Sequence, residues 1–293
     1  MVITAFAMKF IGAVGGALRH TPLVRWAWLG KLHAGIVWKL RGKRDSFQVG
    51  EFKVFVDPRD RVIASRLALY GGFEQREISL LCSLVTTGDC VLDIGANIGL
   101  YALALSRAVG PLGRVIAVEP DKDNHDILAR NLEANGCTNV TIVNEAMGDR
   151  DETVSLYQTD ENRGALSTSD ILGVGEERAT KVRMRRGDAI LAELGARPRI
   201  AKIDVEGAEP SVMQGLGDYL PPILLFEMVP WQLRAAGHDP LGMLQWLDAR
   251  GYRLDLVDPD TGGHRTYAPE ALLAEIESIR GDRNVLARRD LPA

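Results

Sequence analysis

The chain has 293 residues, a formal net charge of −4 at pH 7 and a hydrophobic fraction of 46%. This length allows one large or two small domains, and the composition is that of a soluble globular protein. Three widely spaced cysteines without a CxxC pair, and five scattered histidines, give no metal-ligand spacing and indicate reduced thiols in a cytoplasmic protein.

Residues 1–44 are apolar and basic. They hold eight Lys and Arg side chains and no acidic residue, so the rest of the chain must carry −12 to give the net charge of −4. Charges interrupt each apolar run, which argues against a transmembrane helix, and the missing leading charge argues against a secretory signal. Two alternatives remain: a helical cap packed on the domain, or a Trp-containing helix lying on the anionic inner face of a membrane. We therefore expect an extension over 1–46 and a domain over 47–293.

The segment that follows predicts a small β-hairpin and two helices. Residues 47–57 alternate between apolar and polar side chains, and Pro58 ends this pattern. Residues 61–70 and 74–84 have helical periodicity, separated by Gly71 and Gly72.

Residues 91–101, VLDIGANIGLY, predict a strand, a glycine turn and a helix. Gly95 and Gly99 leave room for a sharp bend and for close approach of a ligand. The carboxylate of Asp93 would repel a phosphate but favour a cation. S-adenosylmethionine fits this charge, because it carries a sulfonium and an ammonium and no phosphate. We expect Ala96 and Asn97 to contact it as well.

Residues 114–120, RVIAVEP, predict a second buried strand that ends at Glu119, twenty residues after Gly99. An acidic residue at this place can accept hydrogen bonds from both ribose hydroxyls of a bound nucleoside. An exposed charge at the end of a strand is the alternative reading of Glu119 alone.

The remaining periodicity alternates between strands and helices, which predicts an α/β fold with a doubly wound sheet. In chain order, the predicted elements are a helix at 124–135, a strand at 140–144, paired strands at 153–157 and 180–186, strands at 199–205 and 223–227, a helix at 240–250, and strands at 252–257 and 284–288. Residues 258–283 are polar and Gly-rich at first and then helical.

Acidic side chains gather where the fourth and fifth of the buried strands end. Asp204, Glu206 and Glu209 follow one strand and Glu227 ends the next, so we expect them in the crevice that the glycine turn borders. A carboxylate there can remove the proton of an acceptor hydroxyl, and Asp204 is the first candidate, before Glu206 and Glu227. His238 is the alternative base. Glu206 and Glu209 can instead stabilise a helix N-terminus.

Three blocks of sequence carry a family resemblance. They are VDPRD…ALYGGFEQREISLL, VLDIGANIGLYALALSRAVGPLGRVIAVEP and AKIDVEGAE, within residues 55–229. With this spacing the chain resembles the FkbM family of methyltransferases. The resemblance implies a class I, Rossmann-like fold with a mostly parallel seven-stranded sheet, an antiparallel last strand at its edge, and a cofactor-binding core at about 85–230. It also implies an S-adenosylmethionine-dependent enzyme that methylates a hydroxyl of a sugar, glycan, lipid-linked glycan or natural product.

The resemblance adds candidate residues. Glu74 matches a family block and could reach the methionine ammonium, although it can equally stabilise a helix N-terminus. The residues expected to border adenine are Glu145, Ala146 and Asp149, and those expected beside the substrate are Asn162, Arg163 and Ser167. A plain turn at Gly148 and Asp149 is the alternative for the adenine group.

Two other functions remain open. One is a membrane-surface module in which the basic residues 1–44 dominate. The other is a nucleic-acid methyltransferase, which the acidic body of the chain disfavours. The acceptor, its methylated position and the oligomeric state are not predicted by the sequence.

Overall fold

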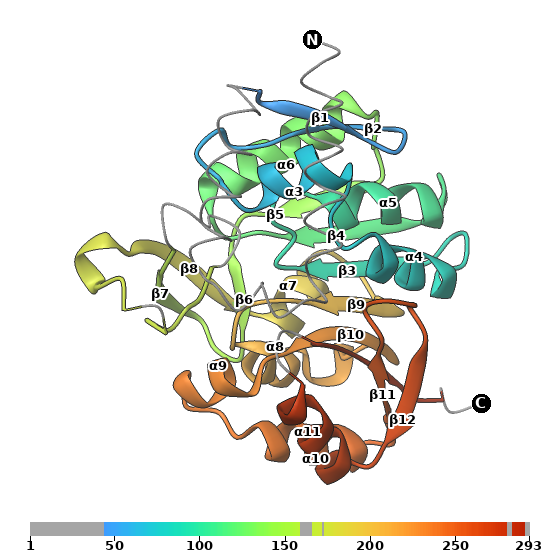
Figure 1. Ribbon diagram of the computed structural model, residues 1–293, viewed down its shortest axis with the longest axis vertical. Coiled ribbons are helices and arrows are strands. Elements are labelled where there is room, and N and C mark those ends of the chain that lie inside the picture. The colour runs from blue at the N-terminus through green and yellow to red at the C-terminus, as the bar shows by residue number, and fades with distance from the viewer. Residues whose placement is uncertain (1–43, 159–165, 172, 280–282, 291–293) are drawn as a thin grey trace, which may run out of the picture. The chain divides into compact units, whose positions relative to one another are not determined.

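The computed structural model describes residues 44–158, 166–171, 173–279 and 283–290 (Figure 1). They form two compact units, the first up to Glu74 and the second from Gln75 onward. The extension expected over residues 1–46 lies almost wholly outside the described residues, so the choice between cap and membrane helix stays a prediction. No helix in the described residues is long and apolar enough to cross a membrane.

The first unit contains the predicted hairpin and a helix. Strands β1 (Ser46–Val49) and β2 (Phe52–Phe55) pair antiparallel, which confirms the hairpin. Helix α3 (Ile63–Tyr70) begins where the carboxylate of Asp60 accepts a hydrogen bond from the amide of Ile63, and it ends at Gly71. Its buried side contains Ile63, Ala64 and Leu67.

The second unit is built on an eight-stranded sheet with the order β12-β11-β13-β10-β9-β3-β4-β5. The chain runs outward from β3 to β5 and returns to β9 beside β3, so the strand order reverses between these two strands. Strands β5, β4, β3, β9 and β10 are parallel, while β13 and β12 run antiparallel to their neighbours. The bounds are β3 Cys90–Ile94, β4 Arg114–Val118, β5 Val140–Val143, β9 Ile200–Ile203, β10 Ile223–Met228, β11 Arg253–Val257, β12 His264–Tyr267 and β13 Arg283–Arg288.

Helices cover both faces of this sheet, as the alternation of buried side chains requires. One face packs against α4 (Gln75–Leu84) and α5 (Leu100–Val109). The other packs against α7 (Gly187–Glu193), α8 (Glu209–Leu216), α9 (Pro230–Ala235), α10 (Pro240–Asp248) and α11 (Pro269–Ser278). Helix α6 (Lys122–Ala134) follows β4 and begins at Asp121, whose carboxylate accepts from the amide of Asn124. The expected doubly wound α/β fold is therefore confirmed.

Two expectations about the sheet were wrong. The sheet has an eighth strand, β12, in the segment expected to be polar and then helical, and its exposed sequence HRTY lacks the apolar alternation that would reveal it. Strand β13 does not lie at the edge but between β10 and β11. Its central residues Val285, Leu286 and Ala287 are fully buried, as an inner strand requires.

A three-stranded sheet with the order β6-β8-β7 lies beside this core. Strands β7 (Glu152–Leu156) and β8 (Thr180–Arg186) pair antiparallel, as the alternation predicted. Where a plain turn at Gly148 and Asp149 was the alternative reading, Ala146–Gly148 form strand β6, which pairs with β8. The strand is packed closely there: a Cβ atom at Gly148 would lie 2.4 Å from Sδ of Met184, and one at Gly215 would lie 1.7 Å from the carbonyl oxygen of Gly148.

The glycine turn between β3 and α5 is packed tightly by the protein itself. Gly95 has φ 76°, and a Cβ atom there would lie 1.8 Å from the carbonyl oxygen of Asp204. Gly99 has φ 90°, and a Cβ atom there would lie 2.4 Å from Cδ1 of Leu128. The sequence analysis assigned the close approach at these glycines to a ligand. At least part of it is contact with other residues of the same chain.

The glycine at position 95 should be more sensitive to substitution than a glycine with similar backbone angles in open space. Gly136 is the control, since it has φ 65° and a Cβ atom there would meet nothing within 4 Å. We expect Gly136→Ala to lower the free energy of unfolding by about 1–2 kcal/mol from backbone strain. Gly95→Ala should cost roughly 1–3 kcal/mol more, because the carbonyl of Asp204 must move. Urea unfolding of both variants tests this, and equal losses would contradict it.

Candidate active site

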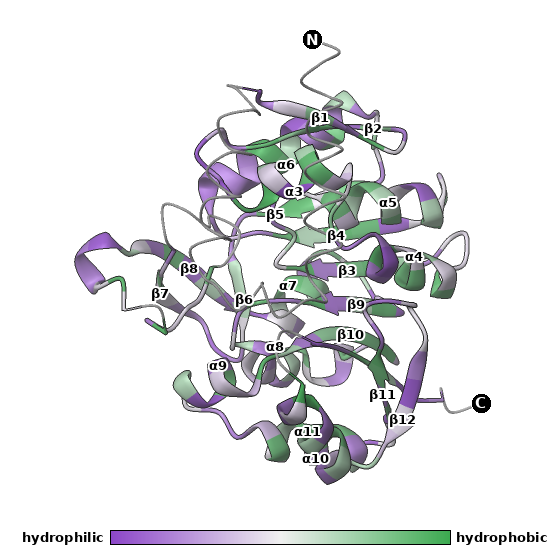
Figure 2. Ribbon diagram, in the orientation of Figure 1, coloured by the Kyte–Doolittle hydropathy of each residue, from purple (hydrophilic) through white to green (hydrophobic). Residues whose placement is uncertain are grey.

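Charged side chains form a row across the middle of the sheet, next to the point where the strand order reverses. Asp93 of β3 lies directly opposite Lys202 of β9, and Lys202 lies opposite Leu225 of β10. Two residues further along, Asp204 and Glu227 stand at the carboxyl ends of β9 and β10 on the same face. Figure 2 shows hydrophilic segments on β3 and β9 within a largely hydrophobic sheet. Ligands of doubly wound sheets bind at this edge.

The glycine turn uses its own amide groups for hydrogen bonds inside the protein. The amides of Gly95 and Ala96 donate to the carbonyl of Val118, each at 3.0 Å. The amide of Asn97 donates to Oε2 of Glu119 at 2.8 Å, and that of Ile98 to Oδ1 of Asn97 at 2.7 Å. The amide of Gly99 donates to the carbonyl of Ala96. The five amides of residues 95–99 are therefore already engaged, whereas a phosphate-binding turn offers its amides to the ligand.

Glu119 holds this turn from the end of β4. Its carboxylate accepts the amide of Asn97 through one oxygen and the amide of Asp121, at 2.9 Å, through the other. Burial raises the pKa of Glu119 to about 8, although both amide hydrogen bonds lower it. Each carboxylate oxygen has a second lone pair, so a hydroxyl pair of a ligand can still donate to it.

Lys202 has the carboxylate partners expected of a buried lysine. Its Nζ lies 3.2 Å from Oδ2 of Asp204 and 3.9 Å from Oδ1 of Asp93. It also donates to the carbonyl of Gly95 at 3.0 Å and lies over the ring of Tyr101. Burial raises the pKa of Asp93 to about 6, and the ammonium of Lys202 opposes this rise.

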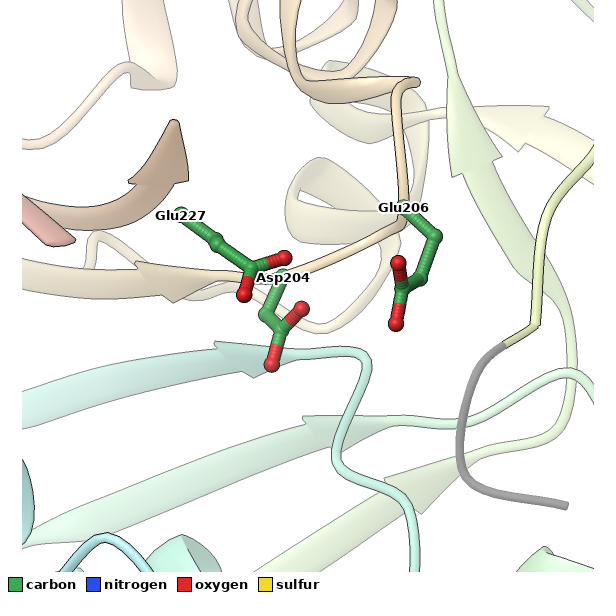
Figure 3. A group of neighbouring side chains, drawn as sticks. All are labelled: Asp204, Glu206 and Glu227. Carbon is green, nitrogen blue, oxygen red and sulfur yellow. The ribbon is translucent and has the colours of Figure 1, made fainter. Parts of the chain in front are cut away.

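Asp204, Glu206 and Glu227 come together, as the carboxyl-end rule predicts. One carboxylate oxygen of each lies within 4.8 Å of the others, and Figure 3 shows Asp204 beside Glu227. Glu206 has φ 52°, and its Oε2 accepts from the side-chain amide of Gln232 on α9 at 2.6 Å. Such a group could hold a cation, but the ammonium of Lys202 already faces Asp204, so we assign no metal to it.

Glu209 stabilises the loop before α8 instead of facing the crevice. Its buried carboxylate accepts the amides of Val205 and Gly207, each at 3.1 Å. Burial raises the pKa of Glu209 to about 7, against these amide hydrogen bonds. Glu209 therefore fixes the loop that leads into α8, and the stabilisation of the helix N-terminus stays a prediction.

The residues expected near adenine lie in different surroundings. Glu145 pairs with Arg183 and Arg185 of β8, and Asp149 accepts a hydrogen bond from Ser211 of α8. Ala146 is buried in β6. Their assignment to an adenine site stays a prediction.

Ser167 contacts the backbone of the loop that follows β9 and contains Glu206. It is 2% exposed, and its hydroxyl donates to the carbonyl of Glu206 at 2.9 Å. Asn162 and Arg163 lie outside the described residues. Glu74, with φ 48°, is the last residue of the first unit, so its role also stays a prediction.

His238 lies apart from the three carboxylates that come together. It lines a hollow of about 190 Å³ between α8 and α10, whose walls include Met213 and Trp246 but neither Asp204 nor Glu227. Burial lowers the pKa of His238, and Asp149 opposes the shift. This position favours Asp204 over His238 as a proton acceptor at the sheet edge.

The sequence analysis did not identify two asparagines that support the glycine turn between β3 and α5. Asn131 of α6 is fully buried and donates to the carbonyl of Ile98 at 2.7 Å. Asn144 follows β5 and donates to the carbonyl of Glu119 at 2.8 Å. An isolated asparagine has no periodic signal, although a buried position on the helix stripe of α6 could have drawn attention to Asn131.

Glu119 should make the stability of the ligand-free protein depend on pH. Its folded pKa, about 8, is above its ordinary value of 4.5, so the folded state holds the proton over this interval. Its contribution to stability is therefore fully present below pH 4.5 and is lost as the pH rises through about 8, by up to about 1.4 kcal/mol per pH unit.

Glu119→Gln should flatten this decline, because the amide side chain does not titrate. The measurement is the urea midpoint between pH 4.5 and 8.5, and exposed Glu133→Gln is the matched control. The glutamine variant will be less stable throughout, since its NH₂ group meets a backbone amide, so the slope is the quantity to compare. A slope equal to that of the wild type would contradict the assignment.

Comparison with known proteins extends these observations. AMB antimetabolite synthetase AmbE of Pseudomonas aeruginosa is 32% identical over 167 residues, which cover 44% of this chain and 8% of that protein. Methyltransferase 1 of Beauveria bassiana is 26% identical over 146 residues, covering 44% of this chain and 58% of that protein. The chain thus matches less than two thirds of the length of either relative.

Among solved structures, a precorrin-6y C5,15-methyltransferase from Geobacter metallireducens aligns with a TM-score of 0.42 and 14% identity, over 74% of this chain and 88% of that one. The family model described as the methyltransferase FkbM domain matches residues 93–254, more than half of the 293 residues, from Asp93 to Leu254 of β11. The chain belongs to the FkbM family of methyltransferases.

Proposed function

We propose that this methyltransferase takes its methyl group from S-adenosylmethionine and transfers it to a hydroxyl of a sugar, glycan, lipid-linked glycan or natural product. Membership of the FkbM family supports methyl transfer. The choice of hydroxyl acceptor rests on the carboxylates at the carboxyl ends of β9 and β10.

The observation that carries the cofactor assignment is the engagement of all five amides of the glycine turn within the protein. A pyrophosphate would find no open amide there and would face Asp93 and Asp204. A sulfonium and an ammonium are favoured by the same carboxylates. Glu119 would hold the ribose hydroxyls. Asp93 and Asp204 would face the sulfonium and the ammonium of the cofactor. The bound cofactor supplies an electrophilic methyl group.

The acceptor side of the proposed site consists of carboxylates. Asp204 or Glu227 can accept the hydroxyl proton and orient the oxygen, as general base catalysis requires. Trp231 begins the exposed side of α9 and is 55% exposed, next to Gln232, which contacts Glu206. An exposed indole on the helix that contacts Glu206 through Gln232 is the kind of side chain that packs on the apolar face of a sugar ring.

The comparisons support a small-molecule acceptor over a nucleic acid. The similarity to an antimetabolite synthetase supports a natural product. The net charge of −12 after residue 44 opposes binding to a phosphate backbone. Salt-sensitive binding of RNA would favour the alternative.

Glu119→Ala should abolish cofactor binding while the protein stays folded, because it removes the ribose acceptor and the anchor of Asn97. Isothermal titration with S-adenosylmethionine measures the loss, which we expect to exceed about 100-fold. Glu133→Ala is the control for removal of a glutamate, and circular dichroism checks the fold. Unchanged binding by Glu119→Ala, or tight binding of NAD or ATP by the wild type, would refute the assignment.

Asp204→Asn should weaken cofactor binding by about tenfold, because one carboxylate charge is lost, but at saturating cofactor it should lower methyl transfer by about 10²- to 10⁴-fold if Asp204 is the base. The assay is release of S-adenosylhomocysteine with a panel of monosaccharides, glycans and hydroxylated natural products. The exposed Asp218→Asn variant controls for the loss of a carboxylate. Full activity of Asp204→Asn would assign the base to Glu227 or Glu206.

A further inference from the structure

The ammonium of Lys202 lies at the centre of the crevice residues. It is 3.0 Å from the carbonyl of Gly95, 3.2 Å from Oδ2 of Asp204 and 3.9 Å from Oδ1 of Asp93. The ring of Tyr101, on α5, closes another side at 4.9 Å from its centroid. Lys202 is 6% exposed, so these groups replace most of the water that would solvate its charge.

Acidic groups from β3 and from the ends of β9 and β4 act on this ammonium. Asp93 lies on β3, Asp204 follows β9, and Glu119 at the end of β4 is near enough for its charge to be felt. Glu206 and Glu227 lie within 4.8 Å of Asp204, and Glu209 lies behind the same loop. The titratable groups that act on Lys202 are Asp93, Tyr101, Glu119 and Asp204, and those that lie near Asp204 are Glu206, Glu209 and Glu227.

This arrangement gives Lys202 two effects that can be separated. Through the carbonyl of Gly95 and the carboxylate of Asp204, it joins the glycine turn to the end of β9. Its charge offsets the burial of Asp93, which has no exposed surface and would otherwise hold a proton more strongly. A crevice of protonated carboxyl groups would have lost its attraction for a cation.

We propose that Lys202 is a positioning residue that keeps Asp93 ionised and fixes Asp204 against the glycine turn, so that the crevice is charged and shaped for a cationic donor. This inference rests on the proposed function. Lys202 itself does not exchange a proton with the acceptor.

The proposal predicts an effect of Lys202→Met that depends on pH. At pH 6 about half of Asp93 is protonated in the wild type. A rise of one pKa unit in the variant should then weaken the binding of S-adenosylmethionine about fivefold relative to the wild type. At pH 9 the carboxylate is ionised in both proteins, and the ratio of the variant's dissociation constant to that of the wild type should fall to one or below, because the variant also lacks the positive charge of Lys202. Dividing the variant by the wild type at each pH removes the titration of the ligand itself.

Two further variants complete the calorimetric series. Lys202→Arg keeps the charge and should keep the pH dependence of the wild type. Lys122→Met removes a lysine whose side chain is 76% exposed. The ratio of its dissociation constant to that of the wild type should stay at one from pH 6 to pH 9. A ratio for Lys202→Met that is the same at pH 6 and pH 9 would show a merely structural role and overturn the proposal.

Urea unfolding without ligand separates this proposal from the proposed function. A buried carboxyl group whose folded pKa is raised loses its stabilising contribution as the pH rises through that value. In Lys202→Met the decline in the free energy of unfolding that is assigned to Asp93 should extend above pH 6. In the double variant Lys202→Met/Asp93→Asn, which removes both charges, this extension should be absent. A parallel pH profile for Lys202→Met and wild type refutes the role of Lys202 whether or not the cofactor binds. Failure of the wild type to bind S-adenosylmethionine refutes only the function.

Discussion

An ammonium buried among carboxylates connects the parts of this site. Lys202 reaches the glycine turn through the carbonyl of Gly95 and the end of β9 through Asp204, across the point where the strand order reverses. Without a cation there, Asp93 and Asp204 would place like charges in a poorly solvated space. The parallel register of β3 and β9 sets Asp93 opposite Lys202, so the sheet itself determines the ion pair.

The turn and the buried carboxylates also explain why this Rossmann-like edge suits a cationic nucleoside. In a phosphate site the protein leaves amides open, whereas here Val118, Glu119 and Asn97 accept them. Two backbone amides fix the carboxylate of Glu119, which the proposed function assigns to the ribose hydroxyls. Asn131 and Asn144 support the same turn from α6 and from the end of β5.

Much of the core could be predicted from sequence, because buried parallel strands are continuous apolar runs and each is followed by a helix with its own periodicity. The meeting of Asp204 and Glu227 followed from the carboxyl-end rule. The positions of β12 and β13 could not be predicted. Strands that are far apart in the sequence can be neighbours in a sheet, and the sequence HRTY of β12 has no apolar pattern. The hydrogen bonds of Glu209 and the need for a glycine at position 95 depend on individual atomic contacts, which the spacing of residues in the sequence does not reveal.

The inner position of β13 has a consequence for biosynthesis. Strands β10 and β11 leave the ribosome before residues 283–288, which bond to both of them. Until then each presents an open edge of unpaired peptide groups, the kind of edge that recruits other chains. The sheet can therefore be completed only after β10, β11 and β13 have all been made, and a nascent chain arrested before this strand would expose two unpaired strand edges to its neighbours.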